Sequence, residues 1–225
     1  MLNLTDMTAI TILLVDDHPV VRMGFQTLLK MNNARYAFHE AENRSEALEL
    51  AARHIPHAIL LDLSLAGAVD FSLIEDLKTA SPGSRILVAS MHEERLYAER
   101  AIRAGANGYL MKNHAAHNIA KAVNTVLEGG TWLSPAMQKQ LMARLLNADQ
   151  SNEWEKISSL SDRELEILRL LGLGLKKSEL ASRLNLSPNT VETYRTNLKR
   201  KLSISTGAEL YRFAFLHFQS EGMPK

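Results

Sequence analysis

Five polar side chains in the first half of the chain stand at the ends of short apolar runs, and together they carry the groups that a phosphoryl site uses. They are Asp16, Asp17, Asp62, Ser90 and Lys112. Carboxylate oxygens are the ligands that Mg²⁺ prefers, and a carboxylate can also act as a nucleophile. A hydroxyl and an ammonium can hold the oxygens of a phosphoryl group. These residue types therefore predict a magnesium-dependent phosphoryl site, provided that the fold gathers them.

The apolar runs are the elements that must position these side chains. They are four or five residues long, are rich in Val, Ile and Leu, and cover residues 11–15, 58–61, 85–89 and 108–111. Such runs are typical of parallel strands buried on both faces of a sheet. The carboxyl ends of parallel strands meet at one edge, so we expect the five side chains to lie together. A single Asp, Ser or Lys would more often be a turn or surface residue, and only the joint pattern favours function.

Helical patterns and one weaker strand complete the first half. We expect the weak strand at 38–42 and helices at 19–31, 45–54, 70–79, 93–104 and 117–128. Ser45 is expected to open the second of these helices, Asp70 to cap the third, and Gly105 to end the fourth. The order βαβαβαβαβα predicts a five-stranded, doubly wound parallel α/β domain of the flavodoxin type.

Composition and charge narrow the class of protein. The chain has 225 residues, of which 46% are hydrophobic and 23% charged, and the absence of Cys excludes disulfides and cysteine metal sites. No apolar run approaches the roughly 18 residues of a membrane span, and the N-terminus lacks a secretory pattern, so we expect a cytoplasmic protein without a membrane partner. Residues 1–130 carry 12 Lys/Arg against 15 Asp/Glu, whereas residues 159–225 carry 11 against 7. This asymmetry indicates a metal- or phosphate-handling half and a half that faces nucleic acid.

Beyond residue 130 the patterns are all helical. A helix is expected from Ser134-Pro135 to about Leu146, and the polar stretch 147–156 is the expected linker. We therefore expect an α/β domain at 9–130, a helix and linker at 131–158, and an all-α domain at 159–220.

The all-α domain is predicted to contain four helices. Ser161 and Glu164 form a capping box at the start of the first helix, and Gly172 and Gly174 are expected to break it. The other helices are expected at 177–184, 188–202 and 206–218, and residues 185–187 form the turn of a helix-turn-helix.

The helix at 188–202 has the composition of a DNA-recognition helix. It begins with Asn189, Thr190, Glu192 and Thr193 and continues with Arg195, Lys199, Arg200 and Lys201. In DNA-binding proteins of this geometry, the N-terminal residues of the second helix face base edges, and Lys and Arg contact phosphates. A helical packing domain with a solvated basic face has the same spacing, so the pattern alone leaves both interpretations open.

Four motifs in the first half resemble the receiver domain of bacterial two-component response regulators. They are LLVDDHPVVR (13–22), ILLDLSL (59–65), VAS (88–90) and GYLMK (108–112). The resemblance implies that Asp62 accepts a phosphoryl group from a sensor histidine kinase, and that Asp16, Asp17 and Asp62 hold Mg²⁺ with the Ser64 carbonyl. It also implies that Ser90 and Lys112 bind the phosphoryl oxygens, and that Ser90 and Tyr109 form the switch. Ala66-Gly67 stands where many family members have Pro-Gly.

Three motifs in the second half resemble the LuxR-type DNA-binding domain. They are LSDRELEILRLL (160–171), KKSELASRLNLSPNTVETYRTNLKRKL (176–202) and AELYRFA (208–214). A receiver followed by this domain is the NarL/FixJ class of response regulators. The resemblance implies base contacts by Glu192, Thr193 and Thr196, phosphate contacts by Lys199 and Lys201, and either role for Arg195. Many members have Lys at the Glu192 position, and a carboxylate there can accept from cytosine N4.

The leading hypothesis is therefore a phosphorylation-controlled transcriptional regulator whose only catalysis is to acquire and lose the phosphoryl group on Asp62. One recognition helix reads few base pairs, so we expect a homodimer on double-stranded DNA. The candidate dimer surface is the stripe formed by Leu210, Phe213, Ala214 and His217. The alternative is that this stripe is internal core, and for Leu210 and Phe213 the pattern favours dimer contact no more than core packing. Two alternatives are a DNA-binding regulator with a phosphorylation-independent receiver and an aspartate-based phosphatase. Ser64 disfavours the phosphatase, because such enzymes usually carry a second Asp at that position.

Overall fold

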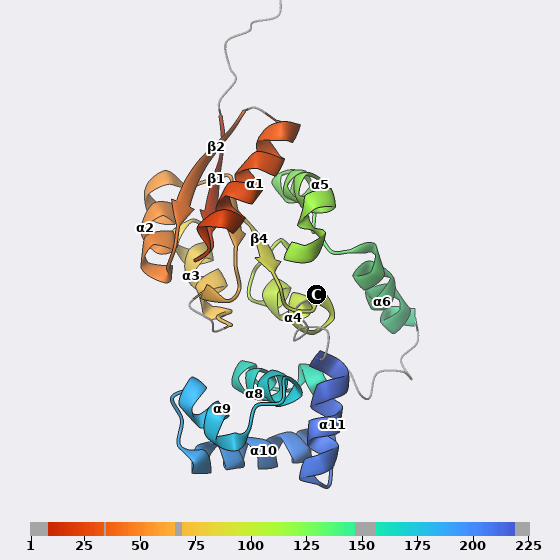
Figure 1. Ribbon diagram of the computed structural model, residues 1–225. Coiled ribbons are helices and arrows are strands. Elements are labelled where there is room, and N and C mark those ends of the chain that lie inside the picture. Colours follow the sequence, from red (N-terminus) through yellow and green to blue (C-terminus); the bar gives the residue numbers. More distant parts are fainter. Residues whose placement is uncertain (1–8, 34, 66–68, 147–155, 219–225) are drawn as a thin grey trace, which may run out of the picture. The chain divides into compact units, whose positions relative to one another are not determined.

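The apolar runs of the first half form a parallel sheet in the computed structural model, which describes residues 9–33, 35–65, 69–146 and 156–218. The strands are β1 (Ile10–Val15), β2 (Tyr36–Ala41), β3 (Ala58–Leu61), β4 (Arg85–Ser90) and β5 (Gly108–Met111). Their spatial order is β2-β1-β3-β4-β5, and every adjacent pair is parallel (Figure 1). The predicted doubly wound α/β fold is confirmed.

The extent to which a strand is buried explains how continuous its apolar run is in the sequence. Every residue of the central strand β3 is buried, which matches its uninterrupted apolar run. The weak strand is β2, which lies at an edge of the sheet and has only its two end residues buried. It spans Tyr36–Ala41 rather than 38–42, because an edge strand needs no continuous apolar run.

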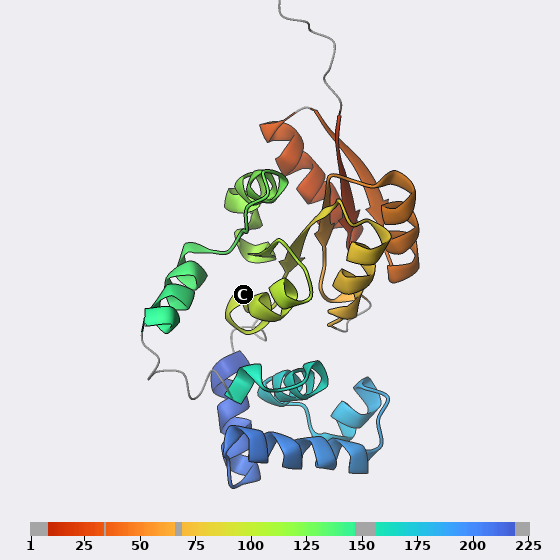
Figure 2. The ribbon, with the colours of Figure 1, turned by 180° about the vertical axis from the view of Figure 1, so that it is seen from behind.

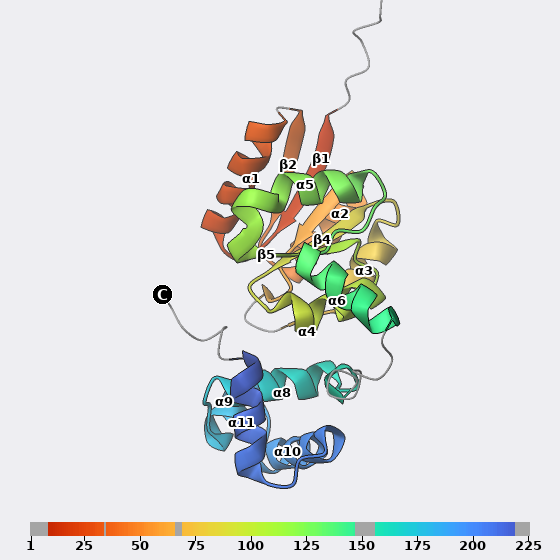
Figure 3. The same cartoon turned by 90° about the vertical axis from the view of Figure 1, so that its right-hand side faces the viewer.

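Helices cover both faces of the sheet. They are α1 (Pro19–Asn32), α2 (Arg44–His54), α3 (Ser72–Ala80), α4 (Glu94–Arg103) and α5 (Ala115–Leu127), with a 3₁₀ turn at Lys112–His114. On one face, Phe25 and Leu29 of α1 share a buried cluster with Ile119 and Val123 of α5. Figure 3 shows α1 and α5 in front of the sheet and α2 and α3 behind it.

Four helix starts of the first half differ from the expected ones by one or two residues, and one of them is that of α4, which begins at Glu94. Asn43 rather than Ser45 precedes α2, and its side chain accepts a hydrogen bond from the Glu46 amide at 3.0 Å. Helix α3 begins at Ser72, and the Asp70 carboxylate accepts from the Ser72 amide. Helix α5 begins two residues early, directly after the 3₁₀ turn. The expected end of α4 is confirmed, since Gly105 has a φ of +108° after it.

The segment after α5 returns to the sheet before the next helix begins. Trp132 forms a parallel bridge with Gly108, and the Tyr109 amide donates to the Trp132 carbonyl at 2.9 Å. A Cβ on Gly108 would lie 2.8 Å from the Trp132 Cβ, so only glycine permits this approach. Helix α6 (Pro135–Leu146) follows as expected, and the amide of the preceding residue, Ser134, donates to Glu94 Oε1 at 2.8 Å.

The chain divides into two compact units between Gln138 and Lys139. The second unit contains α8 (Asp162–Gly172), α9 (Lys177–Arg183), α10 (Pro188–Leu202) and α11 (Gly207–Phe218), as Figures 1 and 2 show. The capping box of Ser161 and Glu164 is confirmed. Residues 147–155 of the expected linker at 147–156, and the pair Ala66-Gly67, lie outside the described residues. None of the described helices combines the length and the apolar character that a membrane span requires.

Helix α8 ends where Gly172 and Gly174 were expected to break it, and Gly172 has an additional role in packing. It is the last residue of α8, and a Cβ there would lie 2.5 Å from the Ala214 carbonyl oxygen of α11. Gly172 therefore lets α8 and α11 approach closely, and Gly174, with a φ of +84°, turns the chain. Asn185 adopts a φ of +52° in the turn before α10, where the Ser187 side chain accepts from the Thr190 amide at 3.0 Å.

Candidate functional site

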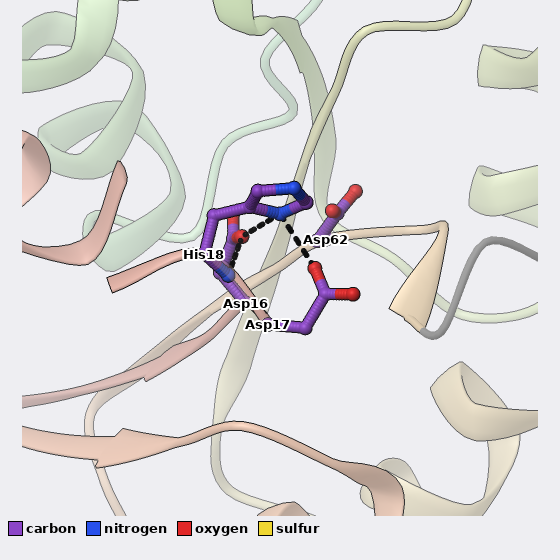
Figure 4. A group of neighbouring side chains, drawn as sticks. All are labelled: Asp16, Asp17, His18 and Asp62. Carbon is purple, nitrogen blue, oxygen red and sulfur yellow. Dashed lines mark hydrogen bonds and ion pairs between the residues drawn. The ribbon is translucent and has the colours of Figure 1, made fainter. Parts of the chain in front are cut away.

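Three carboxylates meet at the carboxyl edge of the sheet. Asp16 and Asp17 follow β1, and Asp62 follows the neighbouring strand β3. Figure 4 shows them together with His18, which the sequence analysis did not select. One ligand atom from each of these four side chains lies within 4.8 Å of the others. Asp16 and Asp62 are 2% and 6% exposed, so little water screens their charges.

Lys112 binds two of the three carboxylates. Its Nζ lies 2.7 Å from Asp16 Oδ2 and 2.8 Å from Asp62 Oδ2. Burial alone would lower the pKa of the Lys112 ammonium, but the charges and hydrogen bonds of Asp62 and Asp16 offset burial and raise the pKa above its ordinary value. Lys112 is therefore fully charged at neutral pH and links the ends of three strands.

Each oxygen of Asp62 has a defined neighbour. Oδ2 accepts from Lys112, and Oδ1 accepts from the Ser64 amide at 3.2 Å. The Ser64 hydroxyl is itself 2.6 Å from Nε2 of His92, which lies on the loop after β4. The fold therefore brings Ser64, from the loop after β3, and His92, from the loop after β4, into direct contact beside Asp62.

Ser90 and Tyr109 are linked through the backbone of His92. The Ser90 hydroxyl is buried and accepts from the His92 amide at 3.1 Å, and the Tyr109 hydroxyl donates to the His92 carbonyl at 3.0 Å. The Tyr109 ring is fully buried. The His92 ring stacks on Tyr97 of α4, with a centroid separation of 4.7 Å. His92 therefore contacts Ser90, Tyr109 and α4, and a movement of the Ser90 side chain would be transmitted to Tyr109 and α4 through His92.

The donor set fits a magnesium ion. Mg²⁺ prefers hard oxygen ligands and usually keeps several waters, and the cluster supplies carboxylate oxygens from Asp16, Asp17 and Asp62 at one edge. His18 Nδ1 lies 2.6 Å from Asp17 Oδ1, and this nitrogen is the less suitable ligand for Mg²⁺. Lys112 alone does not neutralise three carboxylates, and a divalent cation would.

In the second unit, α10 presents most of the predicted DNA-contacting side chains on its accessible face. Val191, Leu198 and Leu202 are buried and form the inward stripe. The residues that line a shallow depression along the accessible face are Lys177, Asn189, Glu192, Thr193, Thr196 and Asn197. The sequence had not indicated Lys177, which comes from α9, or Asn197.

Two basic residues of α10 are engaged within the domain. Arg195 Nη1 donates to Glu192 Oε2 at 3.0 Å, and its guanidinium lies 5.5 Å from the ring of Tyr211 in α11. Lys201 Nζ lies 2.6 Å from Oε2 of the buried Glu164 in α8. Lys199 has no ion-pair partner in the described parts of the chain, and thus remains available for phosphate.

The stripe proposed for dimer contact is split by burial. Leu210 and Ala214 are fully buried in the domain core and cannot meet a partner. Phe213 and His217 remain partly accessible, with ring centroids 4.4 Å apart. The accessible apolar surface of α11 continues instead at Phe215 and Leu216, which lie outside the predicted stripe.

A five-stranded parallel α/β domain with acidic strand ends, followed by a helix-turn-helix unit, is the architecture of a response regulator. The sequence model of the response regulator receiver domain matches residues 12–124, and that of the luxR family of bacterial regulatory proteins matches residues 158–214. The chain belongs to the NarL/FixJ class of transcriptional response regulators. This membership excludes a phosphatase as its principal activity.

Two relatives match almost the whole chain. The oxygen regulatory protein NreC of Staphylococcus carnosus is 31% identical over 207 residues, which are 90% of this chain and 95% of that protein. The transcriptional regulatory protein MctR of Rhizobium johnstonii is 31% identical over 214 residues, which are 95% of this chain and 97% of that protein.

Solved structures agree in fold. RcsB of Salmonella enterica serovar Typhimurium, bound to a promoter in the presence of phosphomimetic BeF₃⁻, has a TM-score of 0.64 at 21% identity and covers 92% of this chain and 98% of its own. A LuxR-family response regulator from Aurantimonas sp. SI85-9A1 has a TM-score of 0.55 at 30% identity, and covers 61% of this chain and 98% of its own.

Proposed function

We propose that a sensor histidine kinase phosphorylates Asp62 in the cytoplasm and that this reaction controls the binding of the protein to double-stranded DNA. The observation that carries the proposal is the contact of Lys112 Nζ with Asp16 and Asp62 at 2.7 and 2.8 Å. It supports a site in which the acceptor carboxylate, a metal-binding carboxylate and a phosphate-binding cation act together.

The reaction needs only one covalent exchange. An oxygen of Asp62 attacks phosphorus, the bond from phosphorus to the donor's nitrogen breaks, and an acyl phosphate forms. Water later attacks the phosphorus, restoring the carboxylate and releasing inorganic phosphate. Lys112 and the Ser90 hydroxyl hold the phosphoryl oxygens, and this charge neutralisation is the main contribution of the protein.

Mg²⁺, when bound by Asp16, Asp17, Asp62 and the Ser64 carbonyl, would neutralise further charge on the transferred group. Asp16 and Asp17 would fix the position of the metal ion relative to Asp62. The Ser64 amide donates to Asp62 Oδ1 and holds the acceptor carboxylate in place.

The phosphorylated state would reach the output domain through Ser90 and Tyr109. When the Ser90 hydroxyl turns to a phosphoryl oxygen, the His92 amide loses its acceptor. The His92 carbonyl accepts from Tyr109, so this change would release the ring and alter the face formed by α4 and β5. The modification thereby shifts a pre-existing equilibrium between two receiver conformations.

In the DNA-binding domain we assign the contacts with DNA bases to the accessible residues of α10. Asn189, Thr190, Glu192, Thr193 and Thr196 lie on the N-terminal two thirds of the helix, and the proposed phosphate contact is Lys199. Arg195 would orient the Glu192 carboxylate through the hydrogen bond between them. Lys201 would primarily hold α10 against α8 through its hydrogen bond to Glu164, and a phosphate contact would be secondary to that role. The protein would act as a homodimer on two half-sites, with domains at 9–130 and 159–220 joined by 131–158.

Intact-mass spectrometry tests the phosphoryl site directly. The full chain is treated with a small phosphodonor and Mg²⁺, and the parent is expected to gain one phosphoryl group. Asp62→Asn is expected to gain none, and the control Asp70→Asn, at a partly exposed carboxylate that pairs with Arg44, is expected to match the parent. An adduct of equal yield in Asp62→Asn would contradict the assignment.

A further inference from the structure

Arg22 is a buried cation that the phosphoryl chemistry does not use. It lies near the start of α1, is only 5% exposed, and donates through three different nitrogens. Nε donates to Glu40 Oε2 at 2.6 Å, Nη2 to Glu42 Oε1 at 2.7 Å, and Nη1 to the Asp16 backbone carbonyl at 2.6 Å. A fork of three donors thus joins α1, the end of β2 and the residue that follows β1.

These contacts enclose the Asp16 peptide from both sides. The Asp16 amide donates to the Ala41 carbonyl at 3.1 Å, and the two glutamates that hold Arg22 are the neighbours of Ala41 in the chain. The end of β2 therefore holds the Asp16 amide directly and the Asp16 carbonyl through Arg22. These two contacts fix the backbone from which the Asp16 side chain extends, and its carboxylate lies 2.7 Å from Lys112 Nζ.

We propose that Arg22 is a positioning residue for the magnesium ligands Asp16 and Asp17, and that its fork geometry, rather than its charge, is what the site requires. The inference rests on the proposed function, since it assumes that these two carboxylates bind Mg²⁺. Arg22 touches neither the metal nor the phosphoryl group, and it acts through the backbone that carries their ligands.

The surrounding charges explain how a cation is tolerated beside a cation-binding site. Burial would lower the pKa of Arg22, but the hydrogen bonds and charges of Glu40 and Glu42 raise it above its ordinary value. One arginine between two glutamates adds a net charge of −1 to this edge, so the clamp does not repel Mg²⁺. Gln26 donates to the other oxygen of Glu40 and helps to hold that carboxylate in place.

Two substitutions separate geometry from charge. Lysine keeps the charge but offers one hydrated nitrogen in place of a planar fork, and glutamine removes the charge. If Arg22 acts only through its charge, Arg22→Lys leaves Mg²⁺ affinity unchanged and Arg22→Gln raises it. If Arg22 positions the loop, both variants weaken Mg²⁺ binding, by about 10-fold.

The experiment is a Mg²⁺ titration of the full, non-phosphorylated chain, followed by NMR at the amides of Asp16, Asp17 and His18. Arg53→Lys makes the same substitution at an exposed position of α2 and is expected to leave the affinity unchanged. Parent-like affinity in Arg22→Lys, or higher affinity in Arg22→Gln, would overturn the positioning role. A parent that shows no Mg²⁺-dependent shift at these amides would overturn the proposed metal site instead.

Thermal melts of each variant check that it is folded. If the Arg22 variants do not fold, the parent itself supplies the test. The Nε–H proton of Arg22, held by Glu40 inside the clamp, is expected to exchange slowly with water, and Mg²⁺ is expected to slow that exchange further. A rapidly exchanging Arg22 proton would overturn the inference.

Discussion

Replacing Gly172 with Ala should weaken the packing of α11 on α8 and so destabilise the DNA-binding domain. The added Cβ would lie 2.5 Å from the Ala214 carbonyl oxygen, 2.9 Å from the Ala214 carbonyl carbon and 2.9 Å from the Phe218 Cβ. Two of these three atoms belong to the backbone of α11. No side-chain rotation can relieve the contact, so the whole of α11 must move away from α8.

The size of the effect follows from two opposing terms. Overpacking a buried contact costs about 1–3 kcal/mol, and a clash with backbone places this site in the upper part of that range. Alanine recovers about 1 kcal/mol of helix propensity relative to glycine. We therefore expect a net loss of about 1–2 kcal/mol, and each 1 kcal/mol corresponds to roughly 4–8 °C in the melting temperature of a domain of this size.

Gly24→Ala in α1 is the matched control. A Cβ on Gly24 meets no atom within 4 Å, so only the propensity term applies, and the variant should be more stable by roughly 0.5–1 kcal/mol. Differential scanning calorimetry of the full chain is expected to resolve the two effects, since Gly24 and Gly172 lie in different compact units. A melting temperature of Gly172→Ala equal to or above that of the parent would refute the close-packing argument.

Three further predictions concern the phosphoryl group, the acid stability and the DNA contacts. His92→Ala should change the lifetime of phosphorylated Asp62, because His92 contacts the Ser64 hydroxyl beside the acceptor; decay rates equal to those of the parent, measured by intact mass, would contradict this role. Burial acts to raise the pKa of Glu164, but hydrogen bonds from Lys201 and Ser161 lower it overall. A carboxylate with a lowered pKa stabilises the fold above its ordinary pKa of 4.5 and loses that contribution as the pH falls through the lowered value, so Glu164→Gln should be less stable than the parent at pH 7 and the difference should shrink in acid. Urea melts across this range would refute the linkage if the difference stayed constant. Lys199→Ala should weaken binding to all DNA sequences and reduce the salt dependence, whereas Thr193→Ala should alter base preference by roughly 1–3 kcal/mol; equal losses on specific and random DNA for both variants would contradict the division of roles.

Local sequence patterns predicted the elements and the residues at their ends. The buried runs before Asp16, Asp62 and Lys112 specify parallel strands, and parallel strands bring their carboxyl ends to one edge whatever the details of packing. For the same reason Ser187 and Pro188 predicted the start of α10, since a cap and a first-turn proline act within a few residues. These interactions are short in sequence, and the residue types alone carry them.

The tertiary structure decided which partner each side chain has. Arg22 meets Glu40 and Glu42, Lys201 meets Glu164, and Gly172 meets Ala214, and each contact joins elements separated in the chain. Whether a lysine on α10 faces DNA or a buried carboxylate depends on how α10 is rotated against α8. That rotation is set by the simultaneous packing of all four helices, which no single stretch of sequence contains. The sequence by itself determined the acidic edge of the sheet and the helix-turn-helix, and only the packing of distant elements determined the contacts of Arg22 around Asp16 and the residues of α10 that remain accessible.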